Sequence, residues 1–267
     1  MRRKGAFVRG RHLSIISWNV NGVRAAEKKG LLQWLEATRP NILALQETKA
    51  APDQVSTALR EPPGYHTEWC AAERKGYSGV ATFSRVPPLA VTRGLGDSRF
   101  DCDGRVLVTT FPEFVFFNIY FPNGGRGPEW IAHKLDFYRR FLEVVSELMA
   151  VGREVIVAGD VNTAYAEIDL ARPRENATTS GFMPEERAGL AQFFEAGLVD
   201  TFRHVRPAEV KYSWWAMWAG ARARNIGWRL DYIFVSPNLR ERIVDADILC
   251  DVMGSDHCPV SLTLDLS

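Results

Sequence analysis

The sequence lacks the features that mark membrane and exported proteins. None of its 267 residues belongs to an apolar run approaching the ~18 residues needed to cross a bilayer. The basic segment 1–11 lacks an apolar core of about 7–15 residues, so it is not expected to direct export. We therefore predict a short basic tail over 1–11, a single domain over 12–267, no membrane association and a cytoplasmic location, beside the nucleoid if the source is prokaryotic.

Charge of one sign and clustered cysteines are also lacking. The chain has 33 Lys and Arg against 32 Asp and Glu, a net charge of +1. This balance excludes a uniformly basic coat for nucleic acid but allows a local basic face. The 4 Cys form no CxxC pair and have no zinc-ligand spacing with His. Any bound metal should therefore be held by oxygen ligands.

Periodic apolar runs predict an α/β fold. Helices are expected at Arg24–Thr38, which Pro40 ends, and at Pro128–Met149, where apolar residues recur at helical spacing. Strands are expected at Leu13–Trp18, Ile42–Leu45, Ser78–Ser84, Arg105–Phe111, Phe114–Tyr120, Glu154–Ala158, Leu230–Val235 and Pro259–Leu264. Several strands follow one another through short turns. This favours two packed, mostly antiparallel sheets flanked by helices over one parallel sheet.

Polar residues lie at the ends of six of these strands. Asn19, Glu47, Tyr120 and Asp160 end or follow apolar runs, while Asp231 and His257 come directly before the apolar runs Tyr232–Val235 and Cys258–Leu264. Neighbouring antiparallel strands start and end at the same edge of a sheet. We therefore expect all six side chains to meet at one rim.

The types of these residues suggest a metal-dependent site. Asn19, Glu47 and Asp160 carry the hard oxygen acceptors that suit Mg²⁺ or Mn²⁺. Each alone is better explained as a turn or capping residue, so the prediction rests on the set. The pair Asp256-His257 is open to three functional interpretations, namely metal ligand, general acid–base and phosphate contact, beside a structural one. Asp231 lies at the start of a hydrophobic strand, where Asp is disfavoured. We therefore expect it to serve another group, such as His257.

Two further segments suit contacts with nucleic acid. Tyr120–Gly127 is a glycine-rich turn that carries Arg126, and backbone amides and Arg both bind phosphate. Tyr212–Trp218 holds three Trp and precedes Arg222 and Arg224, an interleaving of aromatic and basic residues that is typical of nucleic-acid surfaces. A flexible loop and a structural aromatic cluster are the respective alternatives.

Several motifs together resemble one enzyme family. They are WNVNGVR at Trp18–Arg24, LQETK at Leu45–Lys49, GYSGV at Gly76–Val80, GRV at Gly104–Val106, YFPNGGRG at Tyr120–Gly127, GDVNT at Gly159–Thr163, EIDL at Glu167–Leu170, GFMPEER at Gly181–Arg187, GWRLDY at Gly227–Tyr232 and GSDHCPV at Gly254–Val260. They cover almost the whole chain in family order. The chain therefore resembles the exonuclease III type of apurinic/apyrimidinic (AP) endonuclease, within the endonuclease/exonuclease/phosphatase superfamily.

This resemblance implies a fold and a set of roles. The fold would be a four-layered α/β sandwich of the DNase I-like kind, with the active site at one rim. Metal ligands would be Glu47, Asn19 and Asp256; catalytic residues would be Asp160 as water activator, Asn162, His257 held by Asp231, and Tyr120. DNA contacts would come from Arg24, Lys49, Tyr77, Asn123, Arg126, Asn176, Trp214, Met217 and Trp228, with Trp214 and Trp228 lining a pocket for a flipped-out sugar. Asn21 stands where some relatives carry Asp.

The implied activity is cleavage of duplex DNA 5′ to abasic sites. A monomer would use Mg²⁺, or Mn²⁺, and leave a 3′-hydroxyl and a 5′-deoxyribose phosphate, with 3′–5′ exonuclease and 3′-end-trimming side activities. One alternative is another phosphoesterase of the same scaffold, acting on inositol lipids or sphingomyelin, which would have no use for the NGGRG turn or the Trp cluster. The other is a DNA-binding module without catalysis, although every chemical motif position is occupied by a competent residue.

Overall fold

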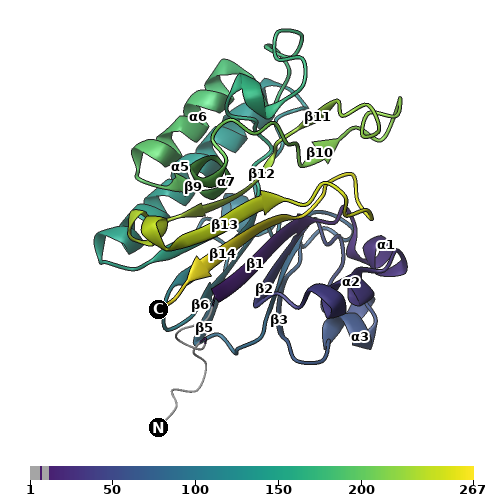
Figure 1. Ribbon diagram of the computed structural model, residues 1–267, viewed down its shortest axis with the longest axis vertical. Coiled ribbons are helices and arrows are strands. Elements are labelled where there is room, and N and C mark those ends of the chain that lie inside the picture. The colour runs from purple at the N-terminus through teal and green to yellow at the C-terminus, as the bar shows by residue number, and fades with distance from the viewer. Residues whose placement is uncertain (1–6, 8–11) are drawn as a thin grey trace.

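Two six-stranded sheets form the centre of the computed structural model, which describes residue 7 and residues 12–267 (Figure 1). The predicted basic tail lies outside the described residues except for Phe7. The Phe7 ring is buried, with its centroid 5.2 Å from that of Phe111 and 5.8 Å from that of Phe114. The domain boundary at residue 12 stays a prediction.

The first sheet has the strand order β13-β14-β1-β2-β4-β3. Its strands are β1 (His12–Asn19), β2 (Ile42–Gln46), β3 (His66–Cys70), β4 (Val80–Ser84), β13 (Ile243–Ile248) and β14 (Val260–Asp265). Only β1 and β2 pair in parallel. Every residue of β2 and β4 is buried, as expected of central strands that are covered on both faces.

The second sheet repeats this plan with the order β5-β6-β7-β8-β12-β9. Its strands are β5 (Ala90–Arg93), β6 (Val106–Thr110), β7 (Val115–Tyr120), β8 (Val155–Asp160), β9 (Val199–Asp200) and β12 (Asp231–Val235). Here only β7 and β8 run in parallel. The prediction of two mostly antiparallel sheets is confirmed.

Apolar side chains from both sheets share one core. Ile15 and Ala44 of the first sheet belong to the same buried cluster as Phe116 and Ala158 of the second. Face-to-face packing of this kind fixes the strand ends of one sheet relative to those of the other. Side chains at one end of both sheets can therefore build a common site.

Helices cover the outer faces of the two sheets, so the predicted four-layered sandwich is confirmed (Figure 1). They are α1 (Val23–Lys28), α2 (Leu31–Thr38), α3 (Thr57–Arg60), α4 (Ser98–Asp101), α5 (Pro128–Ala150), α6 (Pro184–Glu195) and α7 (Thr201–Val205). Three 3₁₀ turns add η1 (Pro52–Gln54), η2 (Glu167–Asp169) and η3 (Pro237–Arg242). A separate ribbon of β10 (Trp214–Trp215) and β11 (Gly227–Trp228) extends from the sandwich.

The single helix predicted over Arg24–Thr38 is wrong. The structure has two helices, α1 and α2, separated at Gly30. Gly30 has a φ of 98°, a left-handed conformation that only glycine adopts without strain, and it caps the start of α2. Apolar spacing continues through both helices and so concealed the break.

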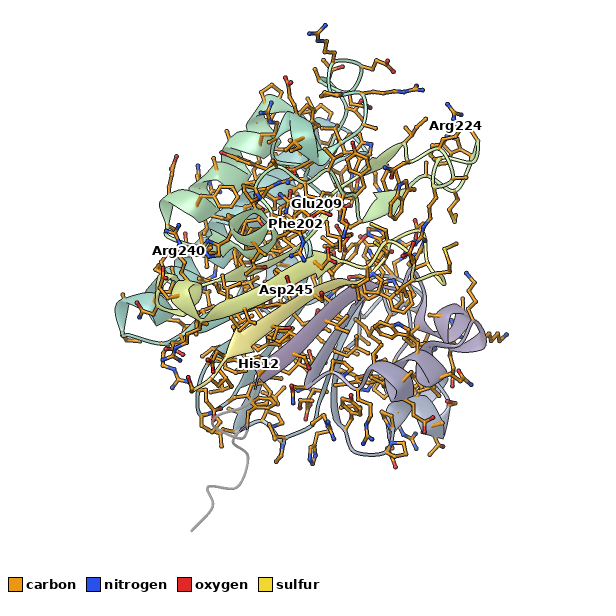
Figure 2. All side chains as sticks on the ribbon, viewed as in Figure 1. His12, Phe202, Glu209, Arg224, Arg240 and Asp245 are labelled. Atoms are coloured by element: carbon orange, nitrogen blue, oxygen red, sulfur yellow. The ribbon has the colours of Figure 1, made fainter. Side chains whose placement is uncertain are left out.

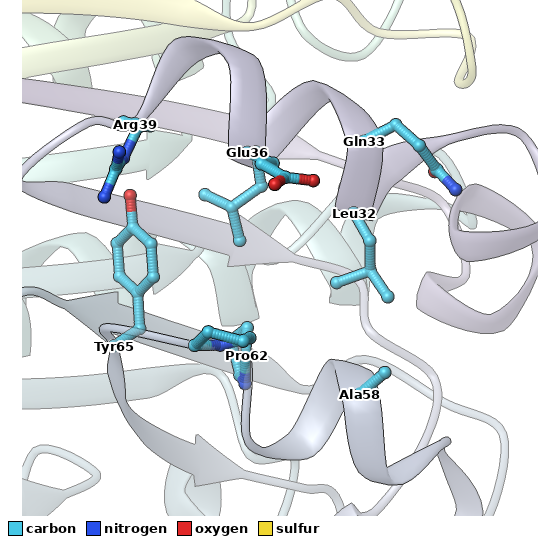
Figure 3. A pocket seen from close by; sticks show the side chains of 9 residues that line it. Leu32, Gln33, Glu36, Arg39, Ala58, Pro62 and Tyr65 are labelled. Carbon is cyan, nitrogen blue, oxygen red and sulfur yellow. The ribbon is translucent and has the colours of Figure 1, made fainter.

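The structure also has a surface pocket on the outer side of the first sheet (Figure 3). Side chains of α2, Ala58 of α3 and the segment 62–65 line it. The Tyr65 hydroxyl at its edge donates to the Pro40 carbonyl at 2.7 Å. None of the lining residues is a predicted site residue. Among the described residues no helix is long and apolar enough to span a membrane.

The aromatic core between α5, α6 and the second sheet gives a test of the packing. The buried Phe193 ring has its centroid 5.1 Å from that of Tyr138, 5.0 Å from Phe141 and 5.8 Å from Phe234. We expect Phe193→Ala to lower the free energy of unfolding by about 3–5 kcal/mol, because it leaves a cavity among these rings. Denaturant unfolding measures this. Val151→Ala, at a residue that is 75% exposed, should change little, and an equal loss in both variants would contradict the packing.

Candidate active site

The six polar residues at strand ends meet at one rim, as their positions predicted. In the second sheet Asp160 is the register partner of both Asp231 and Tyr120. In the first sheet Asn19 ends β1 and pairs with Gln46, directly before Glu47. His257 lies just before β14, the other neighbour of β1. The backbone registers therefore bring these side chains together before any side-chain contact is considered.

Asn19 connects the two sheets at this rim. Its buried amide nitrogen donates to Glu47 Oε1 at 2.8 Å and to Asp160 Oδ2 at 2.9 Å. Its amide oxygen accepts from the backbone N–H of Asn21 at 2.9 Å. One neutral side chain thus holds carboxylates of both sheets within hydrogen-bonding distance of a single nitrogen.

His257 is oriented by Asp231, as the sequence predicted. Nδ1 lies 2.8 Å from Asp231 Oδ2, and Nε2 lies 3.9 Å from Asp160 Oδ2. Burial alone would lower the pKa of His257, but the charges of Asp231, Asp160 and Asp256 raise it to about 10. The ring is therefore cationic at neutral pH and can donate from both nitrogens.

Asp160 has the properties of a general base. Burial and repulsion by Asp231 raise its pKa to about 7, against the opposing charge of His257. The backbone N–H of Asn162 donates to Asp160 Oδ1 at 2.8 Å, from a left-handed turn in which Asn162 has a φ of 56°. The side-chain amide nitrogen of Asn162 donates to the Phe121 carbonyl at 3.0 Å, which fixes this turn against the end of β7.

The side chains at the rim could hold a metal ion. One ligand atom from each of Glu47, Asp160 and His257 lies within 4.8 Å of the other two. Burial opposes ionisation of Glu47, yet the nearby Lys49 ammonium, 2.8 Å from Glu47 Oε2, and the Asn19 bond leave its pKa lowered. Glu47 is thus ionised and can attract a cation. Because the cationic ring of His257 has no free lone pair, the metal donors at the rim are oxygen atoms.

Asp256 lies beside this cluster, in a hydrogen-bonded position. Its Oδ1 accepts from Asn21 Nδ2 at 3.0 Å and from Ser255 Oγ at 3.1 Å, and its Oδ2 accepts from Trp214 Nε1 at 3.1 Å. Burial opposes its ionisation, but the charge of His257 and these bonds lower its pKa. Its predicted role as a metal ligand stays a prediction.

Comparison with known proteins shows the family to which this site belongs. The model of the endonuclease/exonuclease/phosphatase family matches residues 16–257. The chain belongs to this family. It is 45% identical to an exodeoxyribonuclease of Bacillus subtilis, over 95% of this chain and 100% of that protein.

Solved structures also resemble this member of the endonuclease/exonuclease/phosphatase family. An AP endonuclease from Leishmania major superposes with a TM-score of 0.87 at 31% identity, over 97% of this chain and 92% of that one. A 3′-5′ exonuclease from Neisseria meningitidis has a TM-score of 0.87 at 28% identity, over 94% and 99%. The resemblance to exonuclease III-type AP endonucleases is confirmed, and with it the prediction of a DNA-repair hydrolase.

An aromatic wall adjoins the acidic cluster of this family member. The rings of Trp214 and Trp228, paired across the β10–β11 ribbon, meet edge to face with centroids 6.4 Å apart, and the Phe182 ring packs on Trp228 in the same manner at 6.4 Å. The Trp214 ring also lies 6.4 Å from that of His257. The two Trp are half-buried, while Trp215 points into the core, so the adjacent pair does face opposite sides.

The remaining predicted DNA contacts differ in exposure and in bonding. Arg24, Asn123 and Arg126 are exposed, Lys49, Tyr77 and Asn176 are half-buried, and Met217 at the end of the ribbon is 80% exposed. Asn123 donates to Asn162 Oδ1 at 3.0 Å, whereas Asn176 bonds only within its own loop, to the carbonyls of Ala171 and Arg172. Arg224 lies in the exposed loop of the ribbon (Figure 2).

Sequence reasoning missed the role of one buried arginine at the site and assigned another to the wrong surroundings. Arg105 is 3% exposed, donates to the Tyr77 hydroxyl at 2.7 Å, and has its guanidinium 4.9 Å from the centre of the Tyr120 ring. Arg222, read above as part of a nucleic-acid surface, instead stacks on Trp215 and donates to the carbonyls of Cys250, Val252 and Ser255. The motif GRV contained Arg105, but no sequence signal distinguishes a buried arginine from an exposed one.

Glu47→Gln tests the metal site. We expect the Mg²⁺ concentration for half-maximal phosphodiester cleavage to rise roughly ten- to a hundredfold, because the amide removes the charge that attracts the cation. Cleavage rates over a Mg²⁺ titration measure this. Glu61→Gln, at an exposed carboxylate, should leave the titration unchanged, and full activity of the unsubstituted protein in EDTA would contradict metal dependence.

Proposed function

We propose that this chain hydrolyses the phosphodiester bond 5′ to abasic sites in duplex DNA. One arrangement carries the proposal, namely Asp160 facing the His257–Asp231 pair beside the aromatic wall of Trp214 and Trp228. It combines a base and a cationic donor with a surface that suits a sugar without a base. The names of the relatives, an exodeoxyribonuclease, an AP endonuclease and a 3′-5′ exonuclease, support action on DNA.

The reaction follows from the protonation states of the residues. Asp160 accepts a proton from a water, whose oxygen attacks the phosphorus as the bond to the 3′ oxygen breaks. His257 donates a charge-assisted hydrogen bond to a non-bridging oxygen, where negative charge develops. Burial, and the charges of Glu47 and Asp160, raise the pKa of Tyr120 well above its ordinary value, so its hydroxyl remains a proton donor beside the leaving oxygen. The products are a 3′-hydroxyl and a 5′-deoxyribose phosphate.

Glu47 and Asn19, with Asp256 beside them, are the residues that would hold Mg²⁺. Bound there, the ion would supply positive charge to the phosphate and the leaving oxygen. Mn²⁺ suits the same oxygen donors. The rest of the proposed assignment is a monomer that acts in the cytoplasm, with 3′–5′ exonuclease and 3′-end-trimming activities on the same site.

Selectivity for abasic DNA is proposed to come from shape. A nucleotide without a base costs less to extrude from the duplex than a stacked, paired one. A space bounded by Trp214, Trp228 and Phe182 would accept the bare sugar and exclude a base. A lipid phosphatase of the same scaffold would have no use for this wall, and a module without catalysis would not need a base of raised pKa, so both alternatives are less well supported.

Cleavage of a duplex with one abasic site, with Mg²⁺ and with EDTA, tests the proposal directly. Asp160→Asn and His257→Asn should each slow single-turnover cleavage roughly a hundredfold or more, since they remove the base and the charged donor. The double variant should lose less than the product of the two effects, because both residues serve one transition state. Rates near those of the unsubstituted protein in either single variant would remove that residue from the mechanism.

Trp214→Ala and Trp228→Ala test the origin of selectivity. If the rings exclude a base, their loss should lower the ratio of cleavage at abasic sites to cleavage of intact or base-damaged strands. The ratio is measured on matched duplexes at one salt concentration, because phosphate contacts make binding salt-dependent. Melting temperatures are recorded alongside. An unchanged ratio in folded variants would assign the two rings to packing alone.

A further inference from the structure

A fully buried ion pair lies behind the loop that carries Asp160 and Asn162. Lys134 of α5 and Glu186 of α6 have no exposed surface, and Lys134 Nζ lies 2.8 Å from Glu186 Oε1. Taking two charges out of water is costly, and apolar side chains of similar volume commonly stabilise a core as well or better. Stability alone therefore gives a weak reason for this pair.

The contacts of α5 point to the loop. Lys134 Nζ donates to the carbonyl of Asn162 at 2.6 Å. One helical turn later, the Tyr138 hydroxyl lies 2.8 Å from the carbonyl of Val161 and 2.9 Å from Thr163 Oγ1. Side chains four residues apart lie on one helix face, so α5 binds two successive carbonyls of this turn. Asn162 is thereby held in its left-handed conformation.

Glu186 connects this loop to other segments at the rim. Its Oε2 accepts from the backbone N–H of Gly181 at 2.6 Å, and its Oε1 accepts from Ser180 Oγ at 3.1 Å. The Gly181 carbonyl in turn accepts from the N–H of Ala164 at 2.8 Å. Gly124 of the NGGRG turn packs so closely that a Cβ there would lie 3.1 Å from Glu186 Oε1.

We infer that Lys134, Tyr138 and Glu186 are positioning residues, which hold the loop of the proposed general base in its reactive geometry. They touch neither substrate nor metal in this assignment, which rests on the proposed function. Their effect passes through the backbone of residues 161–163 to the carboxylate of Asp160. A small displacement of such a group reduces the rate of the chemical step more than it weakens the binding of DNA.

The paired substitution Lys134→Met with Glu186→Gln tests this inference. It removes both charges together, so neither is left buried without a partner, and glutamine keeps an oxygen acceptor for the Gly181 N–H. We expect the maximal single-turnover rate on an abasic duplex to fall about tenfold or more, with half-saturating DNA within about twofold. Amide hydrogen exchange in residues 160–164 should become faster. Lys134→Arg, which keeps the charge and the donors, should retain most of the rate.

Two further variants keep the result decisive. Val145→Ala is the control, because it removes buried volume from the same helix at a distance from the loop. If its melting temperature falls as far as that of the paired variant, its cleavage rate and its exchange in residues 160–164 should still be unchanged. Tyr138→Phe removes only the hydroxyl contacts and should also lower the single-turnover rate and make exchange in residues 160–164 faster. It therefore tests the inference even if the paired variant does not fold. Rates and exchange equal to those of Val145→Ala would overturn the inference. If the unsubstituted protein does not cleave abasic DNA, the proposed function fails, while the exchange comparison still tests the positioning.

Discussion

The crowding of three carboxylates at the rim is the constraint on which the rest of the site depends. Glu47, Asp160 and Asp231 are brought together by strand registers, and in a buried setting their charges repel one another strongly. The structure balances this repulsion with the His257 cation and the Asn19 amide, and with the Lys49 ammonium at the solvent side. The repulsion that remains helps to raise the pKa of Asp160 to about 7, as a general base needs, and makes the rim attractive to a metal cation.

Charges buried deeper in the molecule support the loops around this rim. Arg229, 1% exposed, pairs with Asp169 at 2.8 Å and with Asp200 at 2.8 Å, and its backbone N–H donates to the Asp169 carbonyl. It stands between Trp228 of the aromatic wall and the strand that begins at Asp231. Lys134 and Glu186 occupy a comparable place behind Asn162. Both networks bind segments next to strand ends, where the hydrogen bonds of a sheet no longer fix the backbone.

Much of this protein was determined by the sequence alone. Alternating and continuous apolar runs located eight strands and the long helix α5, and their short connections indicated two mostly antiparallel sheets. Because side chains at strand ends must share an edge, the pattern of polar residues also predicted the gathering of Asn19, Glu47, Tyr120, Asp160, Asp231 and His257. The motifs then supplied the family, since their order and spacing extend over nearly the whole chain.

Tertiary structure alone decided how these residues are charged and held. The break at Gly30 depends on a backbone angle that apolar spacing does not encode. The strands β3, β5 and β13 were not predicted. They are edge strands, whose half-exposed residues weaken the periodic apolar pattern. Arg105, Lys134 and Glu186 look in the sequence like ordinary surface charges, and their roles appear only when distant segments close over them. Burial and partners separated by tens of residues set the pKa values and the orientation of the site, because electrostatic interactions strengthen only once folding has excluded water.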